Sequence, residues 1–315
     1  MAGTSRDETD RLLELAVKAA QAYDRPDLEV GLAETRTQLR GPAMHVLVVG
    51  EFKQGKSTLI NALLNAEICP TSDDLATVVP TMVRHGAEPS ASLVLEDVLD
   101  DEAHDRPLDA EPATIKREPL AVDEVRRVVA DHGDAADRDG VRMVDVAIPR
   151  RLLESGMAII DTPGVGGLNS VHGAATESAL SLADMVLFVT DASQELSASE
   201  IAWLRRATGR CPNVALALTK VDIYPHWRRI LDINRGHLAA NNLAIEIIPV
   251  SSVLRQMAHV QGSRELNDES GYPALVAKLD QASGERTTLC LLYTSDAADE
   301  GVEGWLGGVG GSGWG

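Results

Sequence analysis

The chain has 315 residues, of which 44% are hydrophobic and 3% aromatic, and its formal net charge is −19. This length and apolar content allow one large folded domain with appendages. A chain this acidic lacks the clustered Lys and Arg that hold a phosphate backbone, so we expect no general nucleic-acid binding. Composition alone indicates no activity.

Three cysteines, Cys69, Cys211 and Cys290, lie far apart without CxxC or Cys/His spacing. Neither a disulfide framework nor a zinc site is expected, and a reducing cytosol fits. The polar start lacks signal-peptide features, and no apolar run approaches the ~20 residues of a membrane span. We therefore expect a cytoplasmic location, with any membrane contact peripheral and at the inner face of the cell membrane.

Residues 1–41 are predicted to form an N-terminal helical segment. Ser5 and Glu8 have capping-box spacing, and apolar residues then recur at helical period until a break at Pro26. Leucines at helical spacing mark a second helix after this break. We expect this segment to precede a larger domain that spans 42–284.

Within 42–284, short apolar runs alternate with helical patterns. The apolar runs lie at 45–49, 157–161, 185–190, 213–219 and 245–250. Helical patterns lie at about 57–66, 173–183 and 197–209. Near-continuous apolar runs indicate parallel strands buried on both faces. The predicted fold class is therefore α/β, a mostly parallel central sheet flanked by helices.

Two segments depart from this pattern. The segment 96–140 is acidic and broken by prolines, with one helical stretch near 121–131, and we predict a surface insertion because nothing in it could form a core alone. In the tail 285–315, the stretch 287–300 resembles a translated sequencing adapter and precedes a Gly-rich run. We expect a non-native or disordered tail, with the native chain continuing beyond about residue 284; a genuine Gly-rich tail is the alternative.

Residues 50–57, GEFKQGKS, match the GxxxxGK[ST] pattern of a P-loop between a predicted strand and a predicted helix. The glycines let main-chain N–H groups and the helix N-terminus face phosphates. Lys56 would reach the β- and γ-phosphates, and Ser57 would ligate Mg²⁺. A glycine turn before a helix with incidental Lys and Ser is the alternative. The predicted nucleotide contacts here are Gly50, Lys53, Gln54, Gly55, Lys56, Ser57 and Thr58.

Two later loops follow strands and complete the pattern. Asp161-Thr162-Pro163-Gly164 lies where a P-loop GTPase places an Asp for the magnesium shell and a Gly whose N–H senses the γ-phosphate. Thr219-Lys220-Val221-Asp222 follows a later strand. The Asp222 carboxylate can accept hydrogen bonds from guanine N1–H and the 2-amino group, a donor pair that adenine lacks, and the Lys220 stem can lie along the ring.

Two weaker signals accompany these motifs. Ser251-Ser252 follows the last apolar run and matches the short loop that contacts the guanine carbonyl, although Ser-rich turns are common. The aromatic and basic cluster 224–229 could cover the nucleotide or meet a partner protomer. The alternative for this cluster is a helix start whose Trp227 packs on its own domain.

Together, GEFKQGKSTLINALL at 50–64, TVVPT at 77–81, DTPGVGG and TKVD resemble the motifs of bacterial dynamin-like GTPases, especially the actinobacterial isoniazid-inducible type. The similarity spans roughly 45–255. It implies a dynamin-type G domain that binds GTP or GDP and hydrolyses GTP with Mg²⁺. Thr77 is then the switch threonine, with Thr81 as the alternative. The implied metal ligands are Ser57, Thr77 and Asp161, and the implied catalytic groups are Lys56, Ser57, Thr77 and Gly164.

The same resemblance implies partners and a larger machine. Family members dimerise across the nucleotide face and couple hydrolysis to a helical neck and a stalk that remodel membrane, so 1–41 is expected to be part of a neck. Val165 stands where Ras-like enzymes have a water-orienting Gln, and Phe52 stands where animal dynamins have one. How the attacking water is oriented is therefore open.

Two other function classes share these motifs. An Era-like GTPase associated with ribosomes or RNA would normally carry a basic RNA-binding module, and the acidity and the N-terminal helices oppose it. A nucleotide-gated scaffold that scarcely hydrolyses GTP is indicated by Phe52 and Val165. Turnover measurements discriminate the scaffold from an enzyme.

Overall fold

A computed structural model gives the fold, and it describes residues 15, 16, 18, 44–71, 79–96, 115–129, 141–163, 180 and 183–284. Of the expected N-terminal helices, only the helical residues 15, 16 and 18 lie in this part. The helix expected at 173–183 and the tail 285–315 lie outside it, apart from residues 180 and 183.

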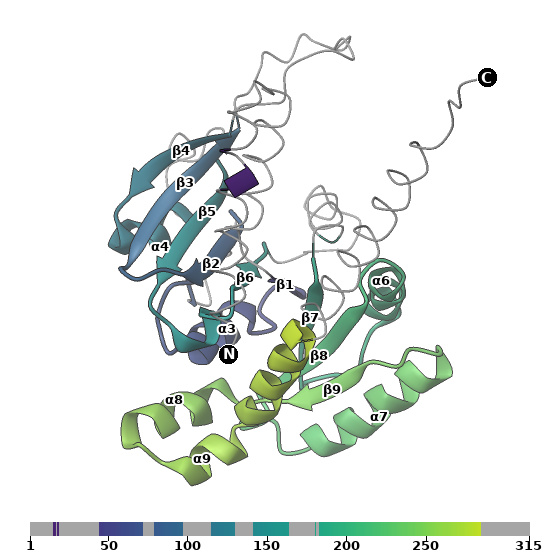
Figure 1. The fold of residues 1–315 in the computed structure, drawn as a ribbon. Coiled ribbons are helices and arrows are strands. Elements are labelled where there is room, and N and C mark those ends of the chain that lie inside the picture. Colours follow the sequence, from purple (N-terminus) through teal and green to yellow (C-terminus); the bar gives the residue numbers. More distant parts are fainter. Residues whose placement is uncertain are drawn as a thin grey trace, which may run out of the picture.

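The described strands form one sheet, in the order β4-β3-β5-β2-β6-β1-β7-β8-β9 (Figure 1). Their bounds are β1 Met44–Val49, β2 Thr81–His85, β3 Ser90–Glu96, β4 Ile115–Leu120, β5 Val141–Ile148, β6 Met157–Asp161, β7 Met185–Asp191, β8 Asn213–Thr219 and β9 Glu246–Pro249. The five strands predicted from apolar runs are β1, β6, β7, β8 and β9. They lie side by side and pair in parallel, which confirms that part of the α/β prediction.

Helices cover both faces of the sheet. The helical elements are α3 Lys56–Leu64, η1 Val122–Glu124, α4 Val125–Val129, η3 Arg151–Leu153, α6 Ala198–Thr208, α7 Trp227–Ala240, α8 Ser252–Gln261 and α9 Arg264–Glu269, with a last helical stretch at 272–284. Residues of α3, α4 and 272–284 share one apolar core, while residues of α6 and α7 share the core on the other face.

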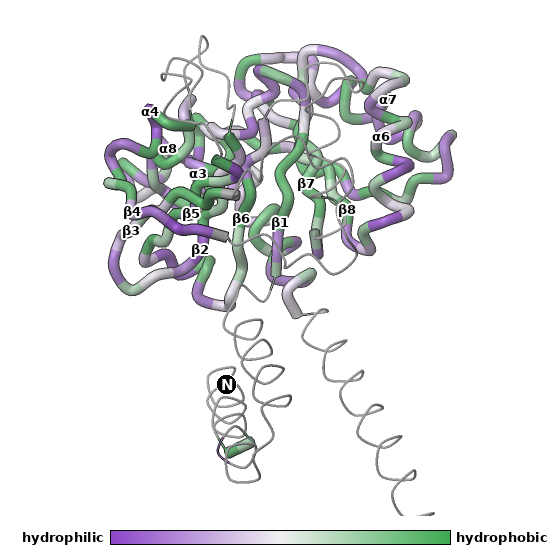
Figure 2. The backbone as a smooth tube through the Cα atoms, turned by 90° about the horizontal axis from the view of Figure 1, so that it is seen from above, coloured by the Kyte–Doolittle hydropathy of each residue, from purple (hydrophilic) through white to green (hydrophobic). Residues whose placement is uncertain are grey.

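The central strand β1 shows why both faces are filled. Val46 and Val48 point into the core that contains Leu59 of α3, and Leu47 and Val49 point into the other core. All five side chains are at most 1% exposed. Full burial of such a side chain contributes about 1.5–3 kcal/mol. Figure 2 shows β1 and β7 as hydrophobic and the edge strand β4 as hydrophilic.

The strands β2, β3, β4 and β5 were not predicted, and they correct part of the interpretation of 96–140. Residues 115–129 are not a surface insertion. The strand β4 pairs with β3, and Val125, Val128 and Val129 of α4 are buried in the apolar core that also contains α3. A charged edge strand and a short helix cannot form a core alone, but they complete the core of a larger sheet. The helical stretch near 121–131 is confirmed by η1 and α4. Residues 97–114 and 130–140 lie outside the described part.

Candidate functional site

The loop 50–57 joins β1 to α3 at the carboxyl edge of the parallel strands. A Cβ on Gly50 would lie 2.2 Å from the Val189 carbonyl oxygen, so only glycine fits against β7. Gly55 has a φ of 92° and is the N-cap of α3, with no side-chain hydrogen bond to the first turn. The N-terminus of α3 therefore presents main-chain donors and the positive end of its dipole at the loop, which favours an anion. Ser57 and Thr58, both partly buried, follow in the first turn.

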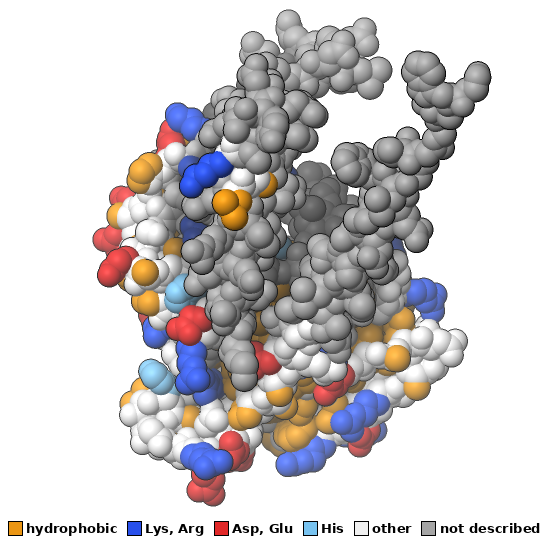
Figure 3. All heavy atoms as spheres, viewed as in Figure 1, with side chains coloured by type: hydrophobic (Ala, Val, Ile, Leu, Met, Phe, Trp, Pro, Cys, Tyr) orange, Lys and Arg blue, Asp and Glu red, His pale blue; other side chains and the backbone are white. Residues whose placement is uncertain are grey.

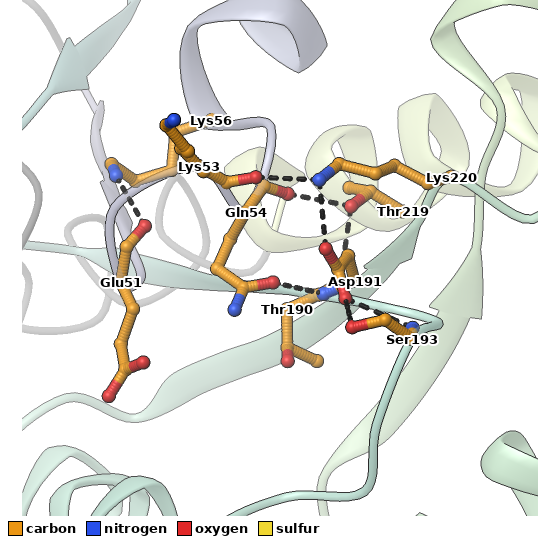
Figure 4. Close-up of polar contacts among 9 residues, drawn as sticks. All are labelled: Glu51, Lys53, Gln54, Lys56, Thr190, Asp191, Ser193, Thr219 and Lys220. Atoms are coloured by element: carbon orange, nitrogen blue, oxygen red, sulfur yellow. Dashed lines mark hydrogen bonds and ion pairs between the residues drawn. The ribbon is translucent and has the colours of Figure 1, made fainter. Parts of the chain in front are cut away.

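Lys56 is folded into this loop. Its side chain is 6% exposed, and its Nζ donates to the Glu51 carbonyl oxygen at 3.0 Å (Figure 4). Burial lowers the pKa of Lys56, although the nearby Asp161 carboxylate opposes this shift. A cation in such a poorly solvated position attracts a phosphate more strongly than one in bulk water.

Ser57 and Asp161 bring two oxygen donors together. The Ser57 hydroxyl donates to Asp161 Oδ2 at 2.8 Å, and Asp161 is fully buried at the end of β6. Thr162, the next residue, donates to the Val48 carbonyl oxygen at 2.8 Å and fixes this loop on β1. Burial and then the Asp161 carboxylate raise the pKa of the Cys69 thiol well above its usual range.

The donor set fits Mg²⁺, which favours hard oxygen ligands and is commonly held by one or two carboxylates together with substrate phosphates. Ser57 and Asp161 supply one hydroxyl and one carboxylate at this place. Across the described ranges, no group of three or more His, Cys, Asp and Glu side chains could hold a metal ion. This pair therefore suits an ion whose remaining ligands come from a nucleotide and water.

A hydrogen-bonded network fastens the P-loop to β7 and β8 (Figure 4). Gln54 Oε1 accepts from the Asp191 main-chain N–H at 2.6 Å, and the Thr219 hydroxyl donates to the Gln54 carbonyl oxygen at 2.7 Å. Lys220 Nζ donates to the Lys53 carbonyl oxygen at 2.7 Å and pairs with Asp191 at 2.8 Å. The side chains of Gln54, Thr219 and Lys220 thus hold the loop in shape.

Asp191 and Asn61 are parts of this site that the sequence analysis missed. Burial favours a higher pKa for Asp191, but hydrogen bonds from Lys220 and Ser193 outweigh it and lower the pKa. The signal that could have found Asp191 is its position at the carboxyl end of a buried parallel strand. The Asn61 side chain accepts from the main-chain N–H groups of Ile68 and Cys69, at 3.0 and 2.9 Å, and fixes the start of the next loop.

The predicted base-contacting residues follow β8 and β9. Asp222 is exposed two residues after Lys220. Ser251 is fully buried as the N-cap of α8, and its Oγ accepts from the Leu254 N–H at 3.1 Å. Ser252 Oγ lies 2.8 Å from the Tyr272 hydroxyl. Both serine hydroxyls are therefore engaged within the domain, and the Asp222 carboxylate faces solvent.

Two predicted residues, Thr77 and Gly164, lie outside the described part. The alternative to Thr77, Thr81, is fully buried at the start of β2, directly opposite Asp161 in the sheet. A strand residue held in that ladder is poorly placed to open and close over a ligand.

The aromatic and basic cluster 224–229 has a structural role in its own domain. Trp227 begins α7 and packs, together with Tyr224, against the core shared by α6 and α7. The Arg228 guanidinium lies 4.4 Å from the centre of the Trp227 ring. This placement matches the simpler of the two interpretations of the cluster.

Comparison with known proteins places the chain in a family. Residues 46–210 match the model of the Dynamin family. Isoniazid-induced protein IniA of Mycobacterium tuberculosis is 39% identical over 277 residues, which cover 88% of this chain and 41% of IniA. A bacterial dynamin-like protein of Nostoc punctiforme is 29% identical over 174 residues, which cover 53% of this chain and 23% of that protein. The chain thus spans less than half the length of these relatives.

Solved structures of bacterial dynamins have a similar fold. A solved structure of an oligomerised bacterial dynamin pair matches with a TM-score of 0.56 at 17% identity, covering 94% of this chain and 47% of the other. A second structure of such a pair matches with a TM-score of 0.54, covering 97% of this chain and 58% of the other. The chain belongs to the dynamin family, and it carries the GTPase domain of a bacterial dynamin-like protein.

Proposed function

We propose that the chain binds GTP and GDP with Mg²⁺ and hydrolyses GTP to GDP and phosphate. The observation that carries this proposal is the direct contact between the two recognition loops. Lys220, two residues before the guanine-selecting Asp222, donates to the Lys53 carbonyl oxygen of the P-loop at 2.7 Å. A ligand with a guanine base at one end and phosphates at the other fits a site whose two loops are joined in this way.

In this proposal the chain's own groups stabilise charge on the phosphates. Lys56, the N-terminus of α3 and the P-loop main-chain N–H groups act on the β- and γ-phosphates. Gln54 contributes through its main chain, because its side chain is bonded to Asp191. Ser57 and Asp161 would hold Mg²⁺, with Thr77 as a further ligand, and the ion would neutralise charge that develops in hydrolysis. Gly164 would sense the γ-phosphate through its N–H.

A second protomer is the proposed source of the missing water-orienting group. Phe52, at the position where animal dynamins have a Gln, is 42% exposed on the P-loop, and Ile223, next to Asp222, is 59% exposed. Two large apolar side chains exposed beside the nucleotide loops support dimerisation or higher assembly through this face. The specific alternative is a nucleotide-gated scaffold that binds GTP without appreciable turnover, because no water-orienting side chain occupies position 52.

Membrane remodelling is a proposal for the full-length protein. The matching dynamin-pair structure is described as a mechanism for long-range sensing and tethering of membranes. No helix within the described ranges is long and apolar enough to cross a membrane. We propose peripheral attachment at the inner face of the cell membrane, from a cytoplasmic location, with residues 1–41 as part of a neck.

We also propose that this protein has no general affinity for nucleic acid. The formal net charge is −19. On the face drawn in Figure 3, the visible Lys and Arg side chains are scattered among Asp and Glu. Among the described residues of this face, Lys and Arg form no continuous basic path for a phosphate backbone. This distribution disfavours the Era-like alternative.

The test is phosphate release by the full chain with Mg²⁺, at several protein concentrations, with GTP and with ATP. We expect specific activity with GTP to rise with concentration, and Lys56→Ala to reduce it by about 100-fold or more. Lys278→Ala is the matched control, because Lys278 pairs with Glu246 at 3.3 Å and belongs to none of the nucleotide loops. GTP binding without turnover at any concentration would favour the scaffold, and equal use of ATP would refute the guanine assignment.

A further inference from the structure

A segment outside every sequence motif, residues 270–272, lies directly behind the Ser251-Ser252 loop. The Ser251 main-chain N–H donates to the Ser270 carbonyl oxygen at 2.9 Å. Gly271 has a φ of 76°, and a Cβ there would lie 2.0 Å from the Pro249 carbonyl oxygen. Tyr272 then places its hydroxyl 2.8 Å from Ser252 Oγ. Three consecutive residues thus hold the loop by one main-chain hydrogen bond, one close backbone approach and one side-chain hydrogen bond.

The hydroxyl of Tyr272 connects this loop to the helix of the P-loop. Tyr272 is 1% exposed, and its Oη lies 3.3 Å from the carbonyl oxygen of Leu59 in α3. A carbonyl oxygen can only accept, so Tyr272 donates to Leu59 and accepts the proton of Ser252. Burial raises the pKa of Tyr272 above its usual range, which keeps the hydroxyl protonated for this role. The direction of the hydrogen-bond chain is therefore Ser252 to Tyr272 to Leu59.

This chain determines what the loop can offer to a base. The single proton of Ser252 is directed at Tyr272, and Ser251 Oγ accepts from the Leu254 N–H. Ser252 therefore has no proton left to donate to a base, and Ser251 is fully buried, so the part of this loop that can meet a base is its main chain. Tyr272 holds that main chain at a set position relative to α3, just as Lys220 holds the other base loop against the P-loop.

We propose that Tyr272 is a positioning residue for guanine recognition, acting through Ser252 on the main chain of the loop. The inference rests on the proposed guanine-nucleotide function and adds a residue that no motif contains. Tyr272 also begins the helical stretch 272–284, whose Leu275 and Leu279 are fully buried. The base loop is thus attached to a packed helix, so it has a rigid support.

The test is a double-mutant cycle with Tyr272→Phe, Ser252→Ala and the double variant of the full chain, using GDP binding by calorimetry and GTP turnover. Each single change should weaken GDP binding by about 3- to 10-fold, the range expected for one hydrogen bond. The double variant should bind GDP no more weakly than Tyr272→Phe, because that single change already removes the hydrogen bond to Ser252 as well as the one to Leu59. KM for GTP should rise while kcat at saturation stays near the wild-type value, a split that lost folding alone would not give.

Ser263→Ala is the matched control, since Ser263 caps the neighbouring helix α9 by accepting from the Leu266 N–H at 3.3 Å, and it should bind GDP like the wild type. Wild-type affinity in Tyr272→Phe, or additive losses in the double variant, would overturn the positioning role while leaving the proposed function intact. A wild-type chain that binds no guanine nucleotide would remove the proposed function and this inference together. If Tyr272→Phe fails to fold, Ser252→Ala alone decides, and unchanged GDP affinity there refutes the role.

Discussion

The two halves of the central sheet have different roles. The strands β6, β1, β7, β8 and β9 are parallel, so their carboxyl ends meet at one edge and bring the P-loop, Asp161, Lys220 and Asp222 together. The strands β2, β5, β3 and β4 are of mixed direction, and of the predicted nucleotide contacts they carry only Thr81, the alternative switch threonine. The contrast shows that side chains meant to act on one ligand are brought together by strands that run in the same direction, whereas strands that only complete the sheet can run in either direction.

The mixed half has its own organising feature, a buried carboxylate. Asp145 on β5 is 2% exposed and accepts from Arg84 Nε of β2 at 2.8 Å and from Arg117 of the edge strand β4. This ion cluster ties three strands together on one face of the sheet. It should stabilise the domain without touching the nucleotide loops.

The largest expected effect lies in the parallel half. Asp222→Ala should weaken GDP binding by about 100-fold, since it removes a charge-assisted acceptor for two guanine donors. Asp222 is exposed, so the free energy of unfolding should change little. Calorimetry with GDP and urea unfolding measure the two quantities, and Asp232→Ala, an exposed residue paired with Arg235, is the control. Undiminished GDP binding would mean that this loop does not select the base.

The next effect tests the mixed half. Asp145→Ala should lower the free energy of unfolding by about 2 kcal/mol, because Arg84 and Arg117 lose the buried carboxylate that accepts their hydrogen bonds. Glu118→Ala, which breaks an exposed pair with Lys116, should cost less than about 0.5 kcal/mol. Urea unfolding gives both values. The folded Asp145→Ala variant should bind GDP with the affinity of the wild type. A loss of GDP affinity together with the loss of stability would show that the two halves of the sheet are coupled.

A smaller effect on stability should depend on pH. Because hydrogen bonds lower the pKa of Asp191 below its ordinary value of 3.8, its contribution to stability is present above that value and is lost as pH falls through the folded-state pKa. Asp191→Asn should destabilise the domain by about 1 kcal/mol at pH 7, and the difference should shrink as pH falls below 4. Measuring the free energy of unfolding of the wild type and the variant at pH values from 7 to 3 gives this difference. A difference that grows on acidification would contradict this sign.

The smallest expected effect is a gain. Gly236 lies inside α7, and an added Cβ would meet nothing within 4 Å. Gly236→Ala should therefore raise the free energy of unfolding by about 0.5–1 kcal/mol and leave GDP binding unchanged. Thermal unfolding checks the gain. A decrease in stability would mean that the backbone at this position requires glycine.

The sequence by itself determined the parallel half and its motifs. Fully buried parallel strands need near-continuous apolar runs, so β1, β6, β7, β8 and β9 were visible in the chain. The P-loop could be recognised in the sequence for a local reason. Gly50 and Gly55 occupy positions where a side chain would clash or strain the backbone, so the loop requires glycine at both. Placing Asp161, Lys220 and Asp222 at one edge then follows from strand direction alone.

Only the tertiary structure decided how the site is braced. The charged edge strand β4 resembles a surface loop in sequence, and nothing near Gln54 indicates that its side chain turns to the main chain of Asp191. Tyr272 and Leu59 are 213 positions apart, yet their hydroxyl and carbonyl groups meet. Such contacts depend on how whole helices and strands pack together. Local patterns of apolar and polar residues do not predict them, because they do not specify which distant groups the packing brings together.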